Sequence, residues 1–271
     1  MKPLFFLSLL LIGQLGFSQE LTLLKVVSLS FSPALSSIDQ SGNIYLVSDR
    51  GFIVKYNAHG DSLMAYSPRK NSQVSIFDAH SSLRPFVFYE DFQEFTFLDQ
   101  FLTTNQLASF YQNLVGFASY AAVSSDNNLW LIDDSDFSLK KYNTLSNTLE
   151  IVTPLNIILT EEDYDVLLIK EYQNKLFILD AKQGLFVFDT YGNLQRKFPL
   201  SVPFLNFFKS DMYYPKDGYI VSMNIYSGNK IGVPLPDEEN EKDISNILRS
   251  ADTFYFVGKD LKIFTLEEVK K

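Results

Sequence analysis

The chain has 271 residues, no cysteine and a formal net charge of −9 at pH 7. The absence of cysteine excludes disulfide bonds and anchoring through a lipidated cysteine. The acidic balance disfavours nucleic acid and anionic lipid as partners, because both bind Lys/Arg-rich surfaces and the basic clusters of this chain are only pairs.

The first 18 residues are typical of a secretory signal peptide. Lys2 supplies a positive charge, residues 4–17 form an apolar stretch, and Gly16-Phe17-Ser18 is a small-x-small cleavage site. A spanning helix needs about 20 apolar residues, so this stretch is short for one, with an uncleaved anchor as the alternative. We expect residues 1–18 to be removed and residues 19–271 to form one exported domain, periplasmic or secreted, without membrane insertion.

A short apolar run occurs six times along the rest of the chain. The runs are residues 44–47 (IYLV), 86–89 (FVFY), 129–132 (LWLI), 176–179 (LFIL), 219–222 (YIVS) and 254–257 (FYFV), and their first residues lie 42, 43, 47, 43 and 35 positions apart. A period near forty with one β-rich unit per period predicts a β-propeller. Runs that are apolar at nearly every position indicate strands buried on both faces. A two-sheet sandwich is the structural alternative.

The first unit is the clearest of the six. Strands are expected at residues 36–39, 44–48, 52–56 and 62–66, separated by turns that contain Gly42, Gly51 and Gly60. Residues 126–152 and 173–198 repeat this arrangement. In the fifth unit, residues 205–208 would be the inner strand and the 219–222 run the second strand, with an unclear outer half.

The two ends of the chain complement each other. After a strand at residues 263–266 only five residues remain, so the sixth unit lacks a fourth strand, whereas residues 21–29 (LTLLKVVSL) form a strand-like segment without a unit. Pairing the two removes exposed sheet edges. We therefore predict an all-β fold, a six-bladed β-propeller closed by an N-terminal strand that completes the last blade.

Residues 37–49 (SIDQSGNIYLVSD), followed by Tyr56 and Gly60, resemble an NHL repeat, whose pattern is roughly D-x-x-G-N-I-Y-V-x-D. The chain departs from that family at Val54-Lys55, where an arginine is common. The resemblance implies a six-bladed propeller that serves as a binding platform, although enzymes occur among the relatives. The whole chain also resembles exported propeller-like proteins of Bacteroidota with unassigned function.

The usual catalytic constellations are missing from the sequence. It contains no G-x-S-x-G, H-E-x-x-H, P-loop or G-x-G-x-x-G motif, and its two histidines are His59 in an expected outer turn and His80 after an inner strand. We therefore assign no catalytic residue and no cofactor-binding residue, and expect His59 and His80 to be ordinary loop residues.

Turns between second and third strands fall on the same face as the connections between blades, and this face collects acidic residues. The candidate binding residues there are Asp133, Asp134, Asp136, Glu161, Glu162 and Asp163. Such a surface suits a basic partner, or Ca²⁺, which takes six to eight oxygen ligands. Tyr226 is a further candidate, because a loop tyrosine combines contact area with a hydrogen-bonding hydroxyl.

These observations favour an exported, monomeric protein- or peptide-binding propeller of the cell envelope without catalytic activity. One alternative is a calcium-dependent, lactonase- or esterase-like hydrolase. The other is a glycan-binding module that uses loop tyrosines.

Overall fold

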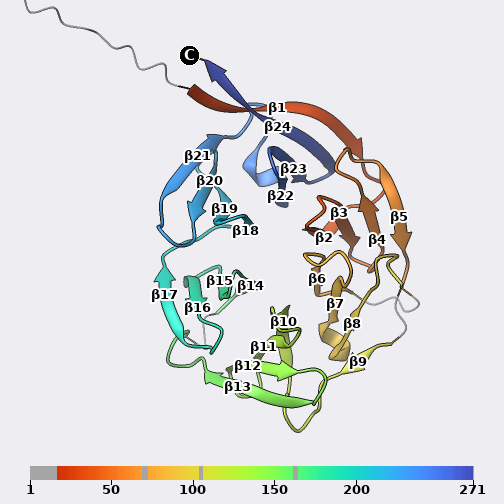
Figure 1. Ribbon diagram of the computed structural model, residues 1–271, viewed down its shortest axis with the longest axis vertical. Helices are drawn as coiled ribbons and strands as arrows, with labels where there is room; N and C mark the ends of the chain where they lie inside the picture. Colours follow the sequence, from red (N-terminus) through yellow and green to blue (C-terminus); the bar gives the residue numbers. More distant parts are fainter. Residues whose placement is uncertain (1–16, 69–72, 104–105, 161–163, 271) are drawn as a thin grey trace, which may run out of the picture.

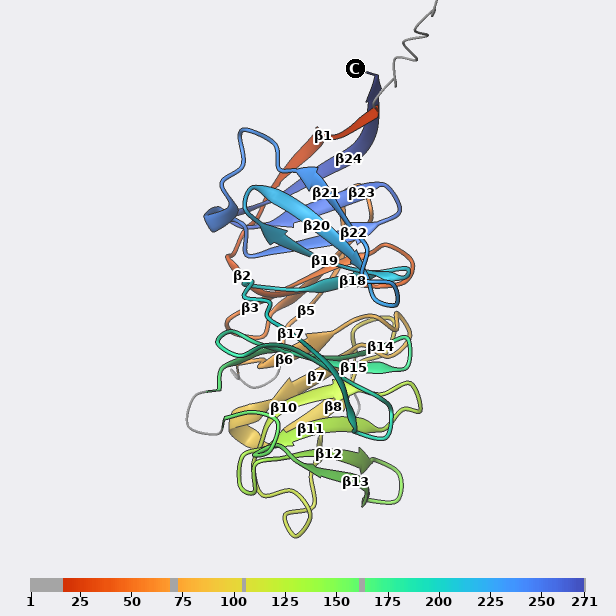
Figure 2. The same ribbon diagram turned by 90° about the vertical axis from the view of Figure 1, so that its left-hand side faces the viewer.

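The computed structural model describes residues 17–68, 73–103, 106–160 and 164–270. Within these ranges the strands form six four-stranded antiparallel sheets, arranged as blades in a ring around a central axis (Figure 1). Seen from the side, the blades follow one another as separate sheets (Figure 2). The predicted six-bladed β-propeller is confirmed, and the two-sheet sandwich is wrong.

The first three blades follow the chain from the inner to the outer strand. Blade one contains β2 (Pro33–Ile38), β3 (Ile44–Ser48), β4 (Ile53–Tyr56) and β5 (Ser62–Tyr66). Blade two contains β6 (Ile76–Asp78), β7 (Phe86–Tyr89), the short 3-10 helix η1 (Glu90–Phe92), β8 (Glu94–Phe97) and β9 (Ala108–Ser109). Blade three contains β10 (Ala118–Val123), β11 (Leu129–Asp133), β12 (Ser138–Asn143) and β13 (Thr148–Pro154).

Blades four to six complete the ring. Blade four contains β14 (Val166–Tyr172), β15 (Lys175–Asp180), β16 (Gly184–Phe188) and β17 (Leu194–Phe198). Blade five contains β18 (Asn206–Phe208), β19 (Asp211–Lys216), β20 (Tyr219–Asn224) and β21 (Lys230–Pro234). Blade six contains β22 (Asn246–Ser250), β23 (Thr253–Val257) and β24 (Asp260–Lys270), preceded by the 3-10 helix η3 (Glu241–Asp243).

The outermost strand of blade six comes from the other end of the chain. β1 (Phe17–Ser28) pairs antiparallel with β24, with Leu21 opposite Leu266 and Val27 opposite Leu261 (Figure 1). This arrangement confirms the predicted closure. Residues 1–16 of the predicted signal peptide lie outside the described residues, so the signal peptide stays a prediction. A cut after Ser18 would leave residues 19–28 of β1 in place.

The core is divided into one hydrophobic cluster between each pair of neighbouring blades. Successive side chains of a strand point to opposite faces. In β3, Tyr45 and Val47 therefore pack against blade two, while Ile44 and Leu46 pack against blade six. All four are fully buried. Burial on both faces explains why the second strands do not alternate between apolar and polar residues.

Blade five corrects one part of the sequence analysis. The run at residues 219–222 belongs to β20, the third strand, whereas the second strand is β19. Proline is unusual inside a sheet because it has no N–H to donate. Pro215 lies within β19, so the sequence pattern did not indicate a strand there. The buried Met212, Tyr213 and Tyr214 of β19 occupy the place that the apolar runs fill in the other blades.

Candidate functional site

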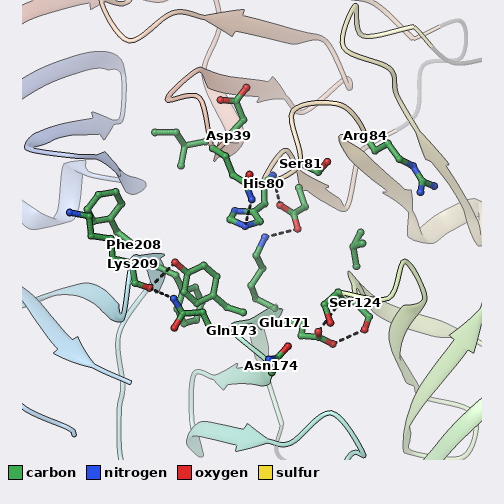
Figure 3. Close-up of a pocket in the computed structure, with 18 of the residues that line it drawn as sticks. Asp39, His80, Ser81, Arg84, Ser124, Glu171, Gln173, Asn174, Phe208 and Lys209 are labelled. Atoms are coloured by element: carbon green, nitrogen blue, oxygen red, sulfur yellow. Dashed lines mark hydrogen bonds and ion pairs between the residues drawn. The ribbon is translucent and has the colours of Figure 1, made fainter. Parts of the chain in front are cut away.

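A channel runs along the axis and widens at one end into a cavity of about 650 Å³, which we call the funnel. Turns that join the first and second strands of the blades line it (Figure 3). Each blade contributes side chains, among them Gln40, Ser81, Ser125, Gln173, Lys209 and Ser250. Turn residues carried by a closed ring of sheets have well-defined positions, as a binding site requires.

The other end of the channel, which we call the opposite mouth, is smaller and mostly apolar. Its cavity of about 290 Å³ is lined by Leu35, Phe77, Leu168 and Phe204, among other residues. A third cavity of about 130 Å³ shares residues with both ends. The three cavities therefore follow one another along the axis.

An ion pair crosses the channel at the floor of the funnel. The Nζ of Lys170 in β14 donates to Oδ2 of Asp78 in β6 at 2.5 Å, joining blades four and two. Both side chains are largely buried and line both the funnel and the cavity below it. Burial alone would raise the pKa of Asp78, but the charge and hydrogen bond of Lys170 outweigh it and hold the pKa below its ordinary value.

His80 lies beside this ion pair. Its backbone N–H donates to Asp78 at 2.9 Å, its Nε2 lies 3.2 Å from Nε2 of Gln40, and its ring meets Tyr172 edge to face at 5.8 Å. Desolvation and the nearby Lys170 charge lower the pKa of His80. The Asp78 charge raises this pKa, but by less. These effects favour the neutral form of the His80 imidazole, and the residue is exposed at the funnel.

Glu171 forms a second polar group in the wall of the funnel and ties blade four to blade three. Its carboxylate accepts hydrogen bonds from Ser124 Oγ at 2.7 Å, the Ser125 N–H at 2.9 Å and Trp130 Nε1 at 2.6 Å. Burial opposes ionisation, but these donors lower the pKa of Glu171. Glu171 stays charged and holds the 124–127 turn at the rim.

The predicted binding residues are divided between the two ends of the molecule. Asp133, Asp134 and Asp136 lie at the β11–β12 turn, at the opposite end of the blade from the funnel turns. Tyr226 lies at the funnel side, where its hydroxyl donates to Gln173 Oε1 at 2.8 Å. Glu161, Glu162 and Asp163 lie outside the described residues. The sequence analysis assigned the acidic positions to the face of the turns between second and third strands, where Asp133, Asp134 and Asp136 lie, and gave Tyr226 as a separate candidate, which lies at the other end.

Asp133 has a structural role at its turn. Its carboxylate is fully buried and accepts hydrogen bonds from Lys140 Nζ at 2.6 Å and from the N–H groups of Gly116 and Phe117 at 2.8 and 3.0 Å. Burial disfavours the ionised carboxylate, but the hydrogen bonds outweigh this effect and lower the pKa of Asp133 to about 2. Asp136 is exposed and also pairs with Lys140, at 2.8 Å. The Asp133 carboxylate therefore has no free side for a ligand.

The structure supplies no set of metal ligands within the ranges it describes. Among those residues, no three His, Asp or Glu side chains are placed to hold a metal ion together. The described part of the chain also contains no helix long and apolar enough to cross a membrane.

Sequence reasoning missed most of the funnel, including Asp78, Lys170, Gln173 and Lys209. A usable signal was the position of these residues at the end of each inner strand, directly before the second strand. The six repeats bring that position to one mouth of the channel.

No family model and no curated protein matches the sequence. Among solved structures, virginiamycin B lyase from Staphylococcus aureus matches with a TM-score of 0.64 at 12% identity, covering 93% of this chain and 100% of that chain. The Pan2 WD40 domain of Neurospora crassa gives a TM-score of 0.62 at 6% identity, covering 94% and 98%. BamB from Moraxella catarrhalis gives 0.50 at 12% identity, covering 90% and 97%. At such identities the likeness establishes the fold, so this chain is a β-propeller whose activity has to be argued from its own site.

Proposed function

We propose that this chain is an exported, non-catalytic propeller of the cell envelope that binds a peptide segment of a protein partner in its funnel. The observation that carries the proposal is the funnel itself, a cavity of about 650 Å³ at the axis to which the inner turns of the six blades contribute. A concave site of this size with a few fixed polar groups and aromatic walls is the usual form of a ligand site.

The chemistry of the funnel suits binding better than bond cleavage. Asp78 and Glu171 are occupied by protein donors, and His80 lies beside Lys170 with no free carboxylate to orient it as a general base. Tyr172 and Phe207 stack at 4.8 Å and offer an apolar wall. The proposed ligand is a short extended segment, which such a wall and the surrounding turn groups would hold by mixed apolar and polar contacts.

The other expectations stay predictions. These are the signal peptide, the exported location, the monomeric state and the NHL-like character of the repeats. All four agree with the proposed function. The calcium-dependent hydrolase has no metal-ligand set among the described residues to support it. The glycan-binding alternative rests on loop tyrosines, and the hydroxyl of one of them, Tyr226, is occupied by Gln173.

A peptide-display selection on the immobilised protein tests the proposed function. We expect enriched peptides that bind the wild-type protein and lose at least about tenfold in affinity, or about 1.4 kcal/mol, in Ser81→Trp, because an indole at this exposed funnel residue fills the cavity. The matched control is Ser135→Trp, which adds the same side chain to an exposed turn at the other end of the blade.

Three outcomes contradict the proposal. One is the absence of any enriched peptide, and another is a set of peptides blocked by Ser135→Trp and unaffected by Ser81→Trp, which would place the site on the predicted acidic face. The third is turnover of esters or lactones that His80→Gln abolishes, which would make the funnel an active site.

A further inference from the structure

The carboxylates that line the funnel all have protein hydrogen-bond donors, whereas some of its cations have no carboxylate partner. Of its carboxylates, Asp39 accepts hydrogen bonds from the N–H groups of Ser41 and Asn43 and from the hydroxyl of Tyr45, at 2.8 to 3.0 Å. The other two carboxylates of the wall are occupied by the donors described above. The acidic groups of the funnel are therefore already satisfied by the protein.

Three of the four cations that line the funnel, Arg84, Lys209 and Arg249, are in a different situation, and Arg84 donates to the neutral side chain of Asn127 at 3.3 Å. The other two lie close to each other in the ring of blades. Lys209 follows β18 and Arg249 lies in β22, so they belong to neighbouring blades, and both line the funnel. The Nζ of Lys209 lies 5.2 Å and the Cζ of Arg249 lies 4.8 Å from the centre of the same ring, that of Phe208. Among the described residues, no carboxylate oxygen lies within 4.0 Å of either cation.

The surroundings fix the backbone of Lys209 and the guanidinium of Arg249 without neutralising either charge. The backbone carbonyl of Lys209 accepts from the Tyr172 hydroxyl at 2.8 Å and from Gln173 Nε2 at 2.7 Å, which fixes the turn. The Nε of Arg249 donates to the carbonyl of Ala251 at 2.9 Å. Asp211 and Asp252 act on Arg249 only from beyond ion-pair distance. Neither charge is neutralised by a carboxylate at ion-pair distance, so an anion that contacts them would gain a favourable electrostatic interaction.

We propose that Lys209 and Arg249, whose charged groups lie 5.2 and 4.8 Å from the centre of the Phe208 ring, bind the terminal carboxylate of a peptide in the funnel. This inference rests on the proposed function, because it names the chemistry of the ligand. A guanidinium binds a carboxylate through two parallel N–H bonds, and the neighbouring ammonium adds a point charge. The stacked Tyr172 and Phe207 rings then lie nearby for an apolar last side chain.

The net charge of the whole protein restricts the class of ligand further. A chain with a net charge of −9 repels a polyanion at long range. A single carboxylate attached to an apolar group experiences little of that repulsion, and it matches a site that offers two cations and aromatic faces. The inferred ligand class is therefore an apolar C-terminal residue with a free carboxylate.

A matched pair of small probes tests this inference on the full protein. N-acetyl-L-phenylalanine carries the aromatic side chain and the carboxylate, and N-acetyl-L-phenylalaninamide differs only by a neutral amide. In NMR titrations we expect the acid to bind at least about tenfold more tightly, or about 1.4 kcal/mol. Its binding should weaken as ionic strength rises, because salt screens the charges. Binding of the amide should be insensitive to salt.

The variants Lys209→Gln and Arg249→Gln remove one charge each. Each should weaken binding of the acid about fivefold or more, and leave binding of the amide unchanged. The matched control is Lys197→Gln, because Lys197 also lies over an aromatic ring, at 4.5 Å from that of Phe186, but on the outer strand β17. Arg249→Lys keeps the charge and provides a second variant should Arg249→Gln fail to fold.

The outcomes separate this inference from the proposed function. Equal affinities for acid and amide, a loss in Lys197→Gln as large as in Lys209→Gln, or no binding of either probe would overturn the carboxylate site. Peptides from the display selection that still depend on Ser81 would then keep the funnel as a binding site of another chemistry. A selection without enriched peptides, in a display format that leaves the peptide C-terminus free, would overturn both.

Discussion

The two ends of the channel are built by the same six inner strands and yet differ in chemistry. The funnel contains the Asp78–Lys170 ion pair and the buried Glu171 with its three donors. The opposite mouth is mostly apolar, and its polar contacts include a short amide chain in which Asn206 donates to Asn246 at 2.6 Å and Asn246 to Ser36 at 2.8 Å.

The difference follows from a polarity gradient along individual strands. β14 starts with the apolar residues 166–169 and ends with Lys170, Glu171 and Tyr172, and β6 ends with Asp78. Because the inner strands of all blades run in the same direction along the axis, such gradients add up at one mouth. The ring therefore separates a packing end from an end that offers charges to a ligand.

The largest effect expected from this comparison concerns Glu171. Glu171→Ala removes one carboxylate and leaves the Ser125 N–H and Trp130 Nε1 without their acceptor, which should lower the free energy of unfolding by about 3 kcal/mol. Asn246→Ala at the opposite mouth breaks neutral hydrogen bonds only and should cost about 1 kcal/mol. Urea unfolding of both variants measures the two losses. Equal losses would contradict the view that the polar structure is concentrated at the funnel.

An intermediate effect is expected at Asp133, outside both mouths. An aspartate carboxyl ordinarily has a pKa of 3.8, whereas the pKa of Asp133 is about 2 in the folded chain, so ionised Asp133 contributes about 2 kcal/mol above pH 4. That contribution is lost as the pH falls through about 2. Asp133→Asn should therefore lower stability at pH 7 by about this amount.

The pH dependence of unfolding measures the Asp133 effect. The gap between the wild-type protein and Asp133→Asn should close between pH 4 and pH 2. The exposed Asp134→Asn, which changes a neighbouring carboxylate of the same turn, is the control. A gap that stays constant down to pH 2 would show that the charge of Asp133 does not stabilise the fold.

The smallest effect on stability is expected at the ion pair on the funnel floor. Lys170→Met should lower the free energy of unfolding by about 1 kcal/mol, because the largely buried pair lines the open funnel, where water can solvate the Asp78 carboxylate that loses its partner. It should also raise the pKa of His80, because the Lys170 charge is one cause of its lowering. An NMR titration of His80 measures this shift, with His59 in an outer turn as the reference. An unchanged titration would show that the Lys170 charge does not act on His80.

The strands and the closure could be predicted from the sequence to a large extent. Runs such as 44–47 and 129–132 are buried on both faces, and that burial is reflected in consecutive apolar residues. The assignment failed in blade five, where Pro215 within the second strand β19 makes that strand hard to recognise, and the sequence analysis assigned its role to the run at residues 219–222, which belongs to the third strand. A periodic pattern identifies the number of blades more securely than the role of each strand.

The candidate site was far less predictable. Turn position and charge directed attention to Asp133, Asp134 and Asp136, but these two features do not distinguish a buried carboxylate with protein donors from one that faces a ligand. Asp78 and Lys170 are separated by 92 positions, and no local pattern indicates that their side chains meet. Lys209 and Arg249 likewise come together only because their blades are neighbours.

The amino-acid sequence by itself determined the repeated apolar runs, the number of blades and the complementary ends, because these depend on the burial and spacing of residues within one repeat. Only the tertiary structure decided which carboxylates are occupied by internal hydrogen bonds and which cations remain without a carboxylate at the axis. Ring closure brings one turn of every blade to the same mouth, and the electrostatics of that mouth depend on distances between residues that are remote along the chain.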